Sequence, residues 1–432
     1  MNAHPAAVTK LNAKALNVTR DRVDPNALDV VRRLRDAGFQ ALLVGGCVRD
    51  LLLGASPKDF DVATDATPEQ VRRLFRRSRM VGRRFKIAHV HYGREFVEVS
   101  TFRKLLAANE KGDHAAHPNG LILRDNAYGT LDEDAFRRDF TVNALYYDPH
   151  GGEILDFVGG IDDIERHCLR CIGNPRERLR EDPVRLLRAM RFQAKLGFAL
   201  DAGITRDERL TAERLTAIPP ARLFEEFVKL FLTGHAADAW RIVKTSRVRN
   251  VLFPTAPPDS PLILLAMDST DRRVGENKPV TPGFLLAVML WEDYRSRIEE
   301  LMASRGTKRK PREAALVAAH ETVAAQRATI AIPRRFSNFI HDIWHLQERL
   351  ESRRPKQVHR TLSHLRFRAA YDFLLLRAEI GTVNRDLVRW WEEIQDADTE
   401  RRDAMVNALR GSAPGGTRRR RRRRRGHRQD DG

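Results

Sequence analysis

Two glycines near the start of the chain limit what the first third of the sequence can fold into. Gly45 and Gly46 separate an apolar, strand-like run at 41–44 from a helix-like run at 47–53 that contains Arg49. Glycines at such a turn let the backbone approach a ligand closely, and the free N–H groups of the helix start attract an anion. The segment therefore predicts a phosphate-binding turn between a strand and a helix.

Two aspartates follow this turn. Asp59 and Asp61 are two residues apart in a segment with the pattern of a strand, where alternate side chains point to one face. Mg²⁺ prefers oxygen ligands, and a pair of such ions can activate an attacking hydroxyl and neutralise a leaving phosphate. An isolated Asp-x-Asp is most simply a solvated turn, but after Gly-Gly-x-x-Arg-Asp the pair indicates nucleotidyl transfer.

Length and charge set the broad class of the protein. A chain of 432 residues is long enough for two to four domains of about 100 to 200 residues each. The formal charge of +19 indicates a polyanionic partner, which could be RNA, DNA or an anionic membrane surface. The sequence has neither an apolar run of about 20 residues nor the apolar core of a signal peptide, so we expect a cytoplasmic location.

The three cysteines do not suggest a disulfide framework. Cys168 and Cys171 have C-x-x-C spacing, but no second pair completes a zinc site. We expect both cysteines to be structural.

The patterning divides the chain into regions of different character. Residues 1–20 are polar and unpatterned, and we expect them to be disordered. Residues 21–175 alternate strand and helix signals, which predicts a small mixed α/β head. From 176 to about 410 the apolar spacing is helical throughout. The sequence thus predicts an α+β protein whose C-terminal half is all helical.

The last 22 residues differ in kind from the rest. Residues 411–417 have the composition of a flexible linker, and Arg418 to Arg425 is an unbroken run of eight arginines. We expect 411–432 to be a disordered cationic tail that binds phosphates without regard to sequence. Its deletion is expected to weaken binding of a polyanionic partner such as RNA and to lessen the salt dependence of that binding.

Two more motifs carry candidate chemistry. One is the run from Arg137 through Arg138 and Asp139 to Ala144, and the other is the run from Glu181 to Phe192. In the second run, Asp182, Arg185 and Arg188 recur at i, i+3 and i+6 and would form one stripe on a helix. A carboxylate and a guanidinium together can read the edge of a base without a template. Asp182 before a proline is also a good helix N-cap, and the two roles are compatible.

In this order the motifs resemble the class II nucleotidyltransferase family of bacterial tRNA CCA-adding enzymes and bacterial poly(A) polymerases. The resemblance covers nearly the whole chain except its two ends. It implies a polymerase β-like nucleotidyltransferase head at 21–175, a helical neck at 176–250 that selects the nucleotide, and a helical body at 251–410 that binds RNA.

The resemblance also implies roles for single residues. Asp59 and Asp61 would be the metal-binding, catalytic carboxylates. A third catalytic carboxylate has two candidates, Asp139, which matches the family motif and is ranked first, and Glu98, which a polymerase β-like palm would supply from a strand. The residues expected to contact the nucleotide are Gly45, Gly46, Arg49, Arg138, Asp182, Arg185 and Arg188.

The segment from Met80 to Val90 resembles the one that separates the poly(A) polymerases from the CCA-adding enzymes. It implies template-independent transfer of AMP from ATP to RNA 3′ ends, with Mg²⁺ as cofactor and with RNA, ATP and the RNA-degradation machinery as partners. Two alternatives stay open, which are CCA addition to tRNA and a non-catalytic RNA-binding protein of the same fold. His341-Asp342 could suggest a metal-dependent phosphohydrolase, but we expect His341 on a helix surface.

Overall fold

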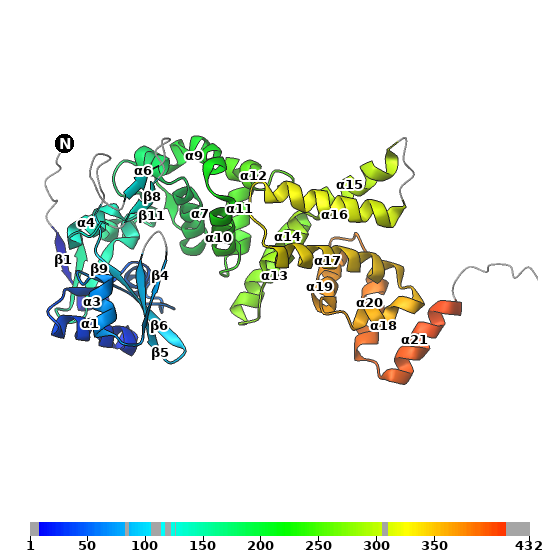
Figure 1. The fold of residues 1–432 in the computed structure, drawn as a ribbon, viewed down its shortest axis with the longest axis horizontal. Coiled ribbons are helices and arrows are strands. Elements are labelled where there is room, and N and C mark those ends of the chain that lie inside the picture. The colour runs from blue at the N-terminus through cyan, green and yellow to red at the C-terminus, as the bar shows by residue number, and fades with distance from the viewer. Residues whose placement is uncertain are drawn as a thin grey trace, which may run out of the picture.

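The computed structural model describes residues 8–82, 86–104, 114–116, 122–125, 127–304 and 310–411. The molecule is elongated, with a mixed α/β head at one end and helices over the rest of its length (Figure 1). This arrangement confirms the predicted α+β fold. The expected disordered tail lies, apart from its first residue, outside the described residues.

One mixed sheet of eight strands forms the centre of the head, in the order β1-β10-β9-β2-β3-β6-β5-β4. β2 runs antiparallel to β9 and β3, whereas β3 and β6 are parallel. The strands of the sheet are β1 Thr9–Asn12, β2 Ala41–Val44, β3 Asp61–Thr64, β4 Ser78–Val81, β5 Ile87–Tyr92, β6 Glu95–Thr101, β9 Leu145–Asp148 and β10 Glu153–Asp156. Two short pairs lie outside it, namely β7 His114–Ala116 with β8 Ile122–Asp125 and β11 Cys168–Leu169 with β12 Ala199–Leu200.

The expectation that residues 1–20 are disordered is wrong from Thr9 onward. β1 pairs with β10, and Ala13 and Val18 are buried in the core of the head. Without β1, β10 would present an unpaired edge of backbone N–H and C=O groups. The sequence concealed this strand because an edge strand exposes most of its side chains and shows little apolar alternation.

Among the described residues of the head there are five helices, and side chains cap the start of several of them. Asp24 accepts hydrogen bonds from the backbone N–H groups of Asn26 and Ala27 at the start of the first helix, and Thr67 and Gln70 form the capping box of the third. The first and third helices pack on one face of the sheet. These helices are α1 Pro25–Asp36, α2 Gly46–Leu52, α3 Pro68–Leu74, α4 Leu131–Arg137 and α5 Gly160–Glu165.

Helices make up the rest of the described chain, and several of them begin with proline, which suits the first turn of a helix. The helices that follow the head are α6 Pro175–Glu181, α7 Val184–Leu196, α8 Ala202–Arg206, α9 Glu208–Arg214, α10 Pro220–Phe231, α11 Ala236–Thr245 and α12 Arg247–Leu252. The distal helices are α13 Pro261–Gly275, α14 Pro282–Met289, α15 Trp291–Ala303, α16 Pro311–Arg327, α17 Arg334–Ser352, α18 Val358–Leu362, α19 Phe367–Glu379, α20 Arg385–Asp396 and α21 Thr399–Gly411. No helix in the described ranges is both long enough and apolar enough to cross a membrane.

Candidate active site

The glycine turn joins β2 to α2 as the sequence predicts. Gly45 has φ +81° and ψ −127°, a conformation that residues with a side chain rarely adopt. A Cβ atom at Gly45 would stand 3.6 Å from Nη1 of Arg138 and 3.7 Å from the carbonyl oxygen of Asn143. The glycine therefore brings bare backbone up to one end of the Arg138 guanidinium.

Arg138 is fixed in place by two groups of the head. Its Nε and Nη2 donate to Oδ2 of Asp134 at 3.1 and 2.9 Å, and Nε also lies 3.0 Å from the hydroxyl of Tyr146. Burial alone would raise the pKa of Asp134, but Arg138 and Arg137 outweigh it and lower that pKa to about 2. The ionised Asp134 thus orients Arg138 with Nη1 toward the glycine turn.

Arg49, expected to contact the nucleotide, is instead enclosed by protein. Its Nη1 donates to Asn143 at 2.5 Å, while Nε and Nη2 donate to Asp50 at 2.9 and 2.6 Å. Its guanidinium lies 5.3 Å from the ring centroid of Phe192 on α7, and Lys195 of the same helix pairs with Asp50 at 3.0 Å. The structure therefore places Arg49 as a connector between the glycine helix and α7.

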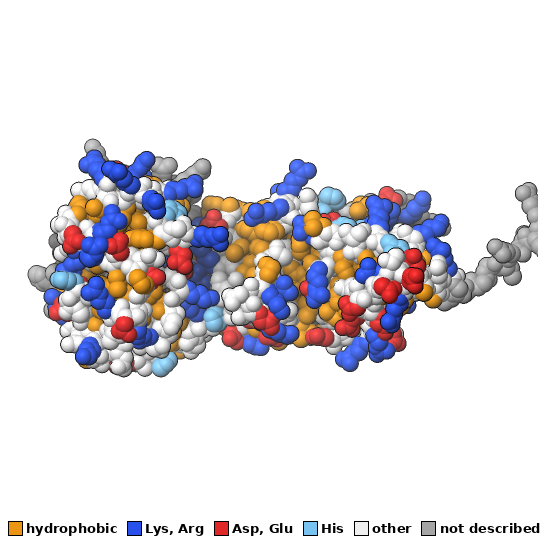
Figure 2. All heavy atoms as spheres, turned by 90° about the horizontal axis from the view of Figure 1, so that it is seen from below, with side chains coloured by type: hydrophobic (Ala, Val, Ile, Leu, Met, Phe, Trp, Pro, Cys, Tyr) orange, Lys and Arg blue, Asp and Glu red, His pale blue; other side chains and the backbone are white. Residues whose placement is uncertain are grey.

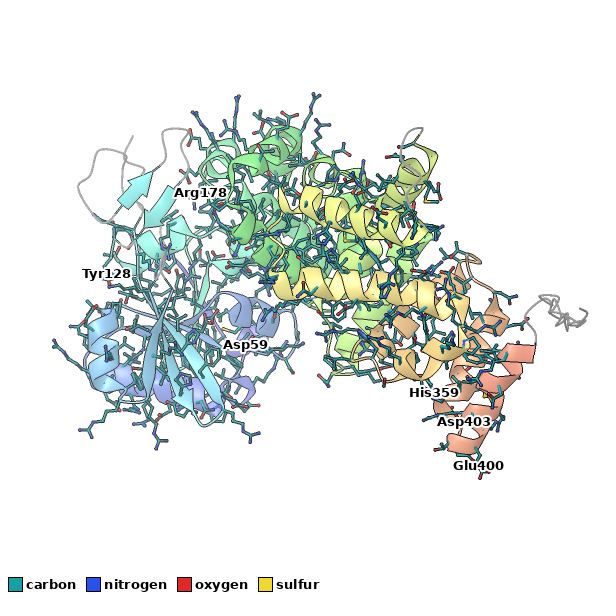
Figure 3. All side chains as sticks on the ribbon, turned by 45° about the vertical axis from the view of Figure 1, so that its right-hand side comes forward. Asp59, Tyr128, Arg178, His359, Glu400 and Asp403 are labelled. Atoms are coloured by element: carbon teal, nitrogen blue, oxygen red, sulfur yellow. The ribbon has the colours of Figure 1, made fainter. Side chains whose placement is uncertain are left out.

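The two aspartates differ in their positions on the sheet. Asp61 is the first residue of β3, opposite Val44 on β2, whereas Asp59 precedes the strand. The expectation that both lie in the strand is therefore wrong for Asp59. The β2 ladder ends because the chain turns away at Gly45, so no residue of β2 remains to pair with Asp59. Figure 3 shows Asp59 on the side of the head that is turned toward the helical part.

Glu98 faces Asp61 directly. The parallel register of β3 and β6 pairs these two residues, and Glu98 is also paired across β6 and β5 with His89, whose Nε2 lies 3.3 Å from its Oε1. Burial, reinforced by the charges of Glu98 and Asp59, raises the pKa of Asp61 to about 6. The charges of Glu98 and Asp59 thus act on the carboxyl group of Asp61 at this end of the sheet.

The residues present fit a hard divalent cation. Asp59 and Asp61 offer only oxygen atoms, and burial, together with the neighbouring charges of Glu98 and Asp59, raises the pKa of Asp61, so a cation would be favoured there. Across the ranges that the structure describes, no group of three or more His, Cys, Asp or Glu side chains is arranged so that it could hold a metal ion by itself. Mg²⁺ in nucleotide-transfer sites is held by one or two carboxylates together with substrate phosphates and water, which is what this pair could supply.

Asp139 has a different environment from the other candidate carboxylates. Its Oδ2 accepts from Nε of Arg188 at 2.7 Å, and its Oδ1 accepts from the backbone N–H of Phe140 at 2.8 Å. Burial would raise the pKa of Asp139, but Arg188 lowers it to about 2. Asp139 is thus an ionised partner of α7.

The three side chains expected to form one stripe, Asp182, Arg185 and Arg188, each contact a different neighbour. Asp182 accepts from Arg222 of α10 at 2.6 Å and from the backbone N–H of Val184 at 3.3 Å, so its capping contact is present. Arg185 donates to the carbonyl oxygen of Arg178 on α6 at 2.6 Å. Arg188 reaches the head, and Asp182 lies between α6 and α7, so the expectation of one helical stripe is wrong for Asp182 and the three side chains contact different elements.

Comparison with known proteins places this site in a family. Residues 41–170 match the poly(A) polymerase head domain, 197–258 match a probable RNA and SrmB-binding site of polymerase A, and 307–426 match the polymerase A arginine-rich C-terminus. Poly(A) polymerase I of Escherichia coli O6:H1 is 41% identical over 415 residues, which cover 93% of this chain and 89% of that protein. The chain belongs to the bacterial poly(A) polymerase I family.

Other relatives agree with this placement. Poly(A) polymerase I of Haemophilus influenzae is 42% identical over 88% of this chain and 86% of its own length. The CCA-adding enzyme of Lactobacillus helveticus is 40% identical but covers only 50% of this chain and 52% of its own. The crystal structure of the Bacillus stearothermophilus CCA-adding enzyme with CTP shares the fold, with a TM-score of 0.59, 24% identity and coverage of 91% and 90% of the two chains.

In this poly(A) polymerase I family member, several site residues carried no recognisable sequence signal. Tyr146 holds Arg138 yet lies in an ordinary apolar run, whereas Asn143, which holds Arg49, lies within the Arg137–Ala144 motif but was not singled out there. Asp134 had a signal, because it stands four residues before Arg138 across the end of α4. Arg191 lies on α7 with its guanidinium 4.8 Å from the Phe192 ring, and burial together with Arg188 lowers its pKa.

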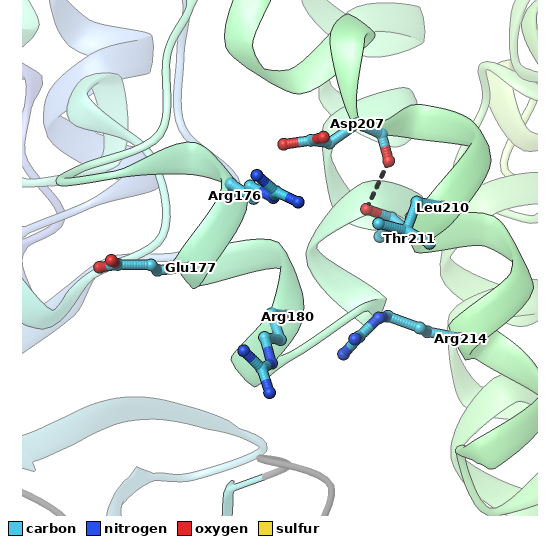
Figure 4. Close-up of a pocket in the computed structure, with 7 residues that line it drawn as sticks. All are labelled: Arg176, Glu177, Arg180, Asp207, Leu210, Thr211 and Arg214. Carbon is cyan, nitrogen blue, oxygen red and sulfur yellow. Dashed lines mark hydrogen bonds between the residues drawn. The ribbon is translucent and has the colours of Figure 1, made fainter.

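Basic side chains also gather beyond the carboxylates. Figure 2 shows Lys and Arg side chains along the hollow where the head meets the helical part. A separate cavity of about 300 Å³ lies between α6 and α9, lined by Arg176, Arg180 and Arg214 together with Glu177, Asp207, Leu210 and Thr211 (Figure 4). Within the described part of the chain these three arginines form no ion pair. On the opposite face of α6, Arg178 donates to the carbonyl oxygens of Arg137 and Arg138.

Proposed function

We propose that this chain transfers AMP from ATP to the 3′-hydroxyl of RNA without a template and releases pyrophosphate. The observation that carries the proposal is the meeting of Asp59, Asp61 and Glu98 beside the Gly45 turn, in a chain 41% identical to a poly(A) polymerase I over 93% of its length. Carboxylates next to a phosphate-binding turn are what nucleotidyl transfer requires.

Asp59 and Asp61 would hold divalent metal ions, with Mg²⁺ favoured by the oxygen ligands. Such ions lower the pKa of the attacking hydroxyl and neutralise charge on the triphosphate. Glu98 is the third carboxylate in this proposal, because it faces Asp61 whereas Asp139 is engaged by Arg188. Asp139 then acts as a positioning residue for α7.

The protein's own groups would bind the nucleotide. The backbone N–H of Gly46 and the Nη1 of Arg138 lie at the same turn and would receive phosphate oxygens, whereas the N–H of Gly45 donates to the carbonyl oxygen of Leu145 at 3.1 Å, so Gly45 would contribute close backbone approach. Asp182, just before α7, and Arg185 and Arg188 on α7 would read the adenine edge. Arg49 would support this site without contacting the nucleotide, because its N–H donors are already bound to Asn143 and Asp50.

RNA would be held by cationic surfaces that take no account of sequence. The three arginines of the α6–α9 cavity are free of ion pairs with described residues and can contact phosphates. Arg214 lies within 197–258, the segment that matches the probable RNA and SrmB-binding site. The arginine run at 418–425 would add a second contact region, and a role with the RNA-degradation machinery follows from the same resemblance.

The test is incubation of the purified protein with a generic RNA primer, Mg²⁺ and either ATP or CTP. A long ladder with ATP alone supports the proposal. Use of CTP, with arrest after three additions when CTP and ATP are supplied together, would support CCA addition, the second candidate, which a CCA-adding relative that matches half of the chain suggests. RNA binding without incorporation of either nucleotide would indicate a non-catalytic RNA-binding protein.

A further inference from the structure

The sheet has one covered face and one open face in the part that carries the carboxylates. Ala88, Val90, Val97 and Val99 alternate along β5 and β6 and are buried on the face against which α1 and α3 pack. The residues between them point to the other face and stay partly exposed. Glu98 belongs to this open face.

Three aromatic rings lie side by side on the open face. His89 and Phe96 are stacked, with ring centroids 4.2 Å apart and an angle of 8° between the ring planes. The centroid of His91 lies 5.9 Å from that of Phe96, at an angle of 57°. Phe96 keeps 47% of its surface exposed, so one side of its ring rests on His89 while much of the rest is open. An aromatic ring left open on a sheet has room for a further stacking partner.

The rings adjoin the candidate catalytic carboxylates. Glu98 is two residues after Phe96 on the same face of β6, it is paired with Asp61 on β3, and it contacts Nε2 of His89. Arg79 on β4 is paired with His89 on β5, so a cation lies next to His89 on the neighbouring strand. An RNA whose 3′-hydroxyl reaches the carboxylates must therefore lay its preceding nucleotides over adjoining protein surface.

We propose that His89, Phe96 and His91 form a platform on which the unpaired bases at the RNA 3′ end stack, an inference that rests on the proposed function. Every base has a flat π face, so stacking holds RNA of any sequence, as repeated addition demands. Single-stranded RNA fits this surface better than an apolar protein segment does. The side chains around Phe96 are the two histidines of the platform, Arg79 and Glu98, which are polar or charged.

Four variants test the platform. Phe96→Ala and Phe96→Leu remove the aromatic ring, whereas Phe96→Trp keeps one. Phe136→Ala on α4 is the control, because Phe136 is also an exposed phenylalanine. We expect the first two to raise the KM for a single-stranded RNA primer about tenfold, with the KM for ATP and the urea midpoint unchanged. Phe96→Trp and Phe136→Ala should stay near the parent protein.

A second measurement does not depend on catalysis. A primer with 2-aminopurine as its penultimate base is added to the protein without ATP, and stacking should quench its fluorescence in the parent and Phe96→Trp proteins but not in Phe96→Ala. Equal quenching and equal KM for RNA in Phe96→Ala and Phe136→Ala would overturn the platform. A change of oligomeric state on Phe96→Ala with RNA affinity intact would also overturn it, by pointing to a second copy as the occupant. Loss of AMP incorporation in the parent protein, with quenching preserved, would contradict the proposed function and leave the platform supported.

Discussion

Nε of Arg188 lies 2.7 Å from Oδ2 of Asp139, and Nη2 of the same arginine lies 2.5 Å from that oxygen. The pair joins α7, the helix proposed to read the base, to the segment of the head that follows Arg138. A second connection runs through Arg49, which contacts Phe192 of α7 and is bound to Asn143 of the head. In the proposed site, base recognition and phosphate binding would therefore be coupled through Asp139, Arg188 and Arg49.

Asp139→Asn should loosen this junction. We expect a loss of about 1 to 2 kcal/mol in the free energy of unfolding, at the low end for charged hydrogen bonds because the Arg188 side chain is 34% exposed. The pKa of Asp139 is lowered to about 2, so the contribution of the pair is complete above about pH 4 and is lost as the pH falls through that value toward 2. Urea unfolding between pH 2 and pH 7 measures the difference. Asp36→Asn, at an exposed ion pair, is the control and should change little.

Glu98→Gln tests which carboxylate completes the catalytic set. We expect single-turnover AMP incorporation at saturating ATP to fall at least about 100-fold, since the charge opposite Asp61 is removed. Asp139→Asn should act mainly on the KM for ATP, and Glu95→Gln, exposed on the same strand, should be near parent activity. If AMP incorporation fell more in Asp139→Asn than in Glu98→Gln, Asp139 would be the third carboxylate.

Metal binding should depend on pH near 6. The pKa of Asp61 is raised to about 6, so below that pH a proton competes with the metal ion. We expect the Mg²⁺ affinity to weaken about tenfold per pH unit below 6 and to be nearly constant from pH 7 to 8. Calorimetric titration with Mg²⁺ at pH 5, 6, 7 and 8 measures this dependence. In Glu98→Gln the midpoint should move to lower pH, and an affinity that is flat down to pH 5 would contradict the assignment.

Patterns in the sequence predict those parts of the site that are formed by residues close together in the chain. The Gly45 turn, the acidic pair and the helix caps each depend on residues within one turn or strand. The pairing of Asp61 with Glu98 depends on the parallel register of two strands joined by a long connection, which no local pattern encodes. The enclosure of Arg49 is hidden from the sequence for the same reason, because the α7 residues that contact Arg49 and Asp50 lie far along the chain.

The polar N-terminal segment gave no sign of β1, since an edge strand with exposed side chains shows no apolar alternation. The α+β division itself was predictable, because apolar spacing over long segments distinguishes helices from strands wherever they pack.

The α6–α9 cavity gives the sharpest test of RNA binding outside the catalytic face. Arg176→Ala combined with Arg180→Ala removes two cations from the cavity, whereas Arg206→Ala combined with Arg209→Ala removes the same charge from exposed positions that do not line it. Each phosphate contact contributes about 0.7 to the slope of log K against log salt for single strands. The cavity variant should therefore lower that slope by about 1.4 and weaken RNA binding several-fold, as measured by fluorescence anisotropy from 50 to 200 mM KCl.

The control variant should reproduce the parent slope within error. Because Arg178 on the opposite face of α6 holds the backbone near Arg138, AMP incorporation at saturating RNA reports whether α6 has kept its position. We expect that rate to be unchanged in the cavity variant, since Arg176 and Arg180 line the α6–α9 cavity and not the carboxylate end of the sheet. Equal slopes for the two double variants would mean that the cavity does not contact RNA phosphates, and a raised KM for ATP with an unchanged slope would assign its arginines to the nucleotide instead.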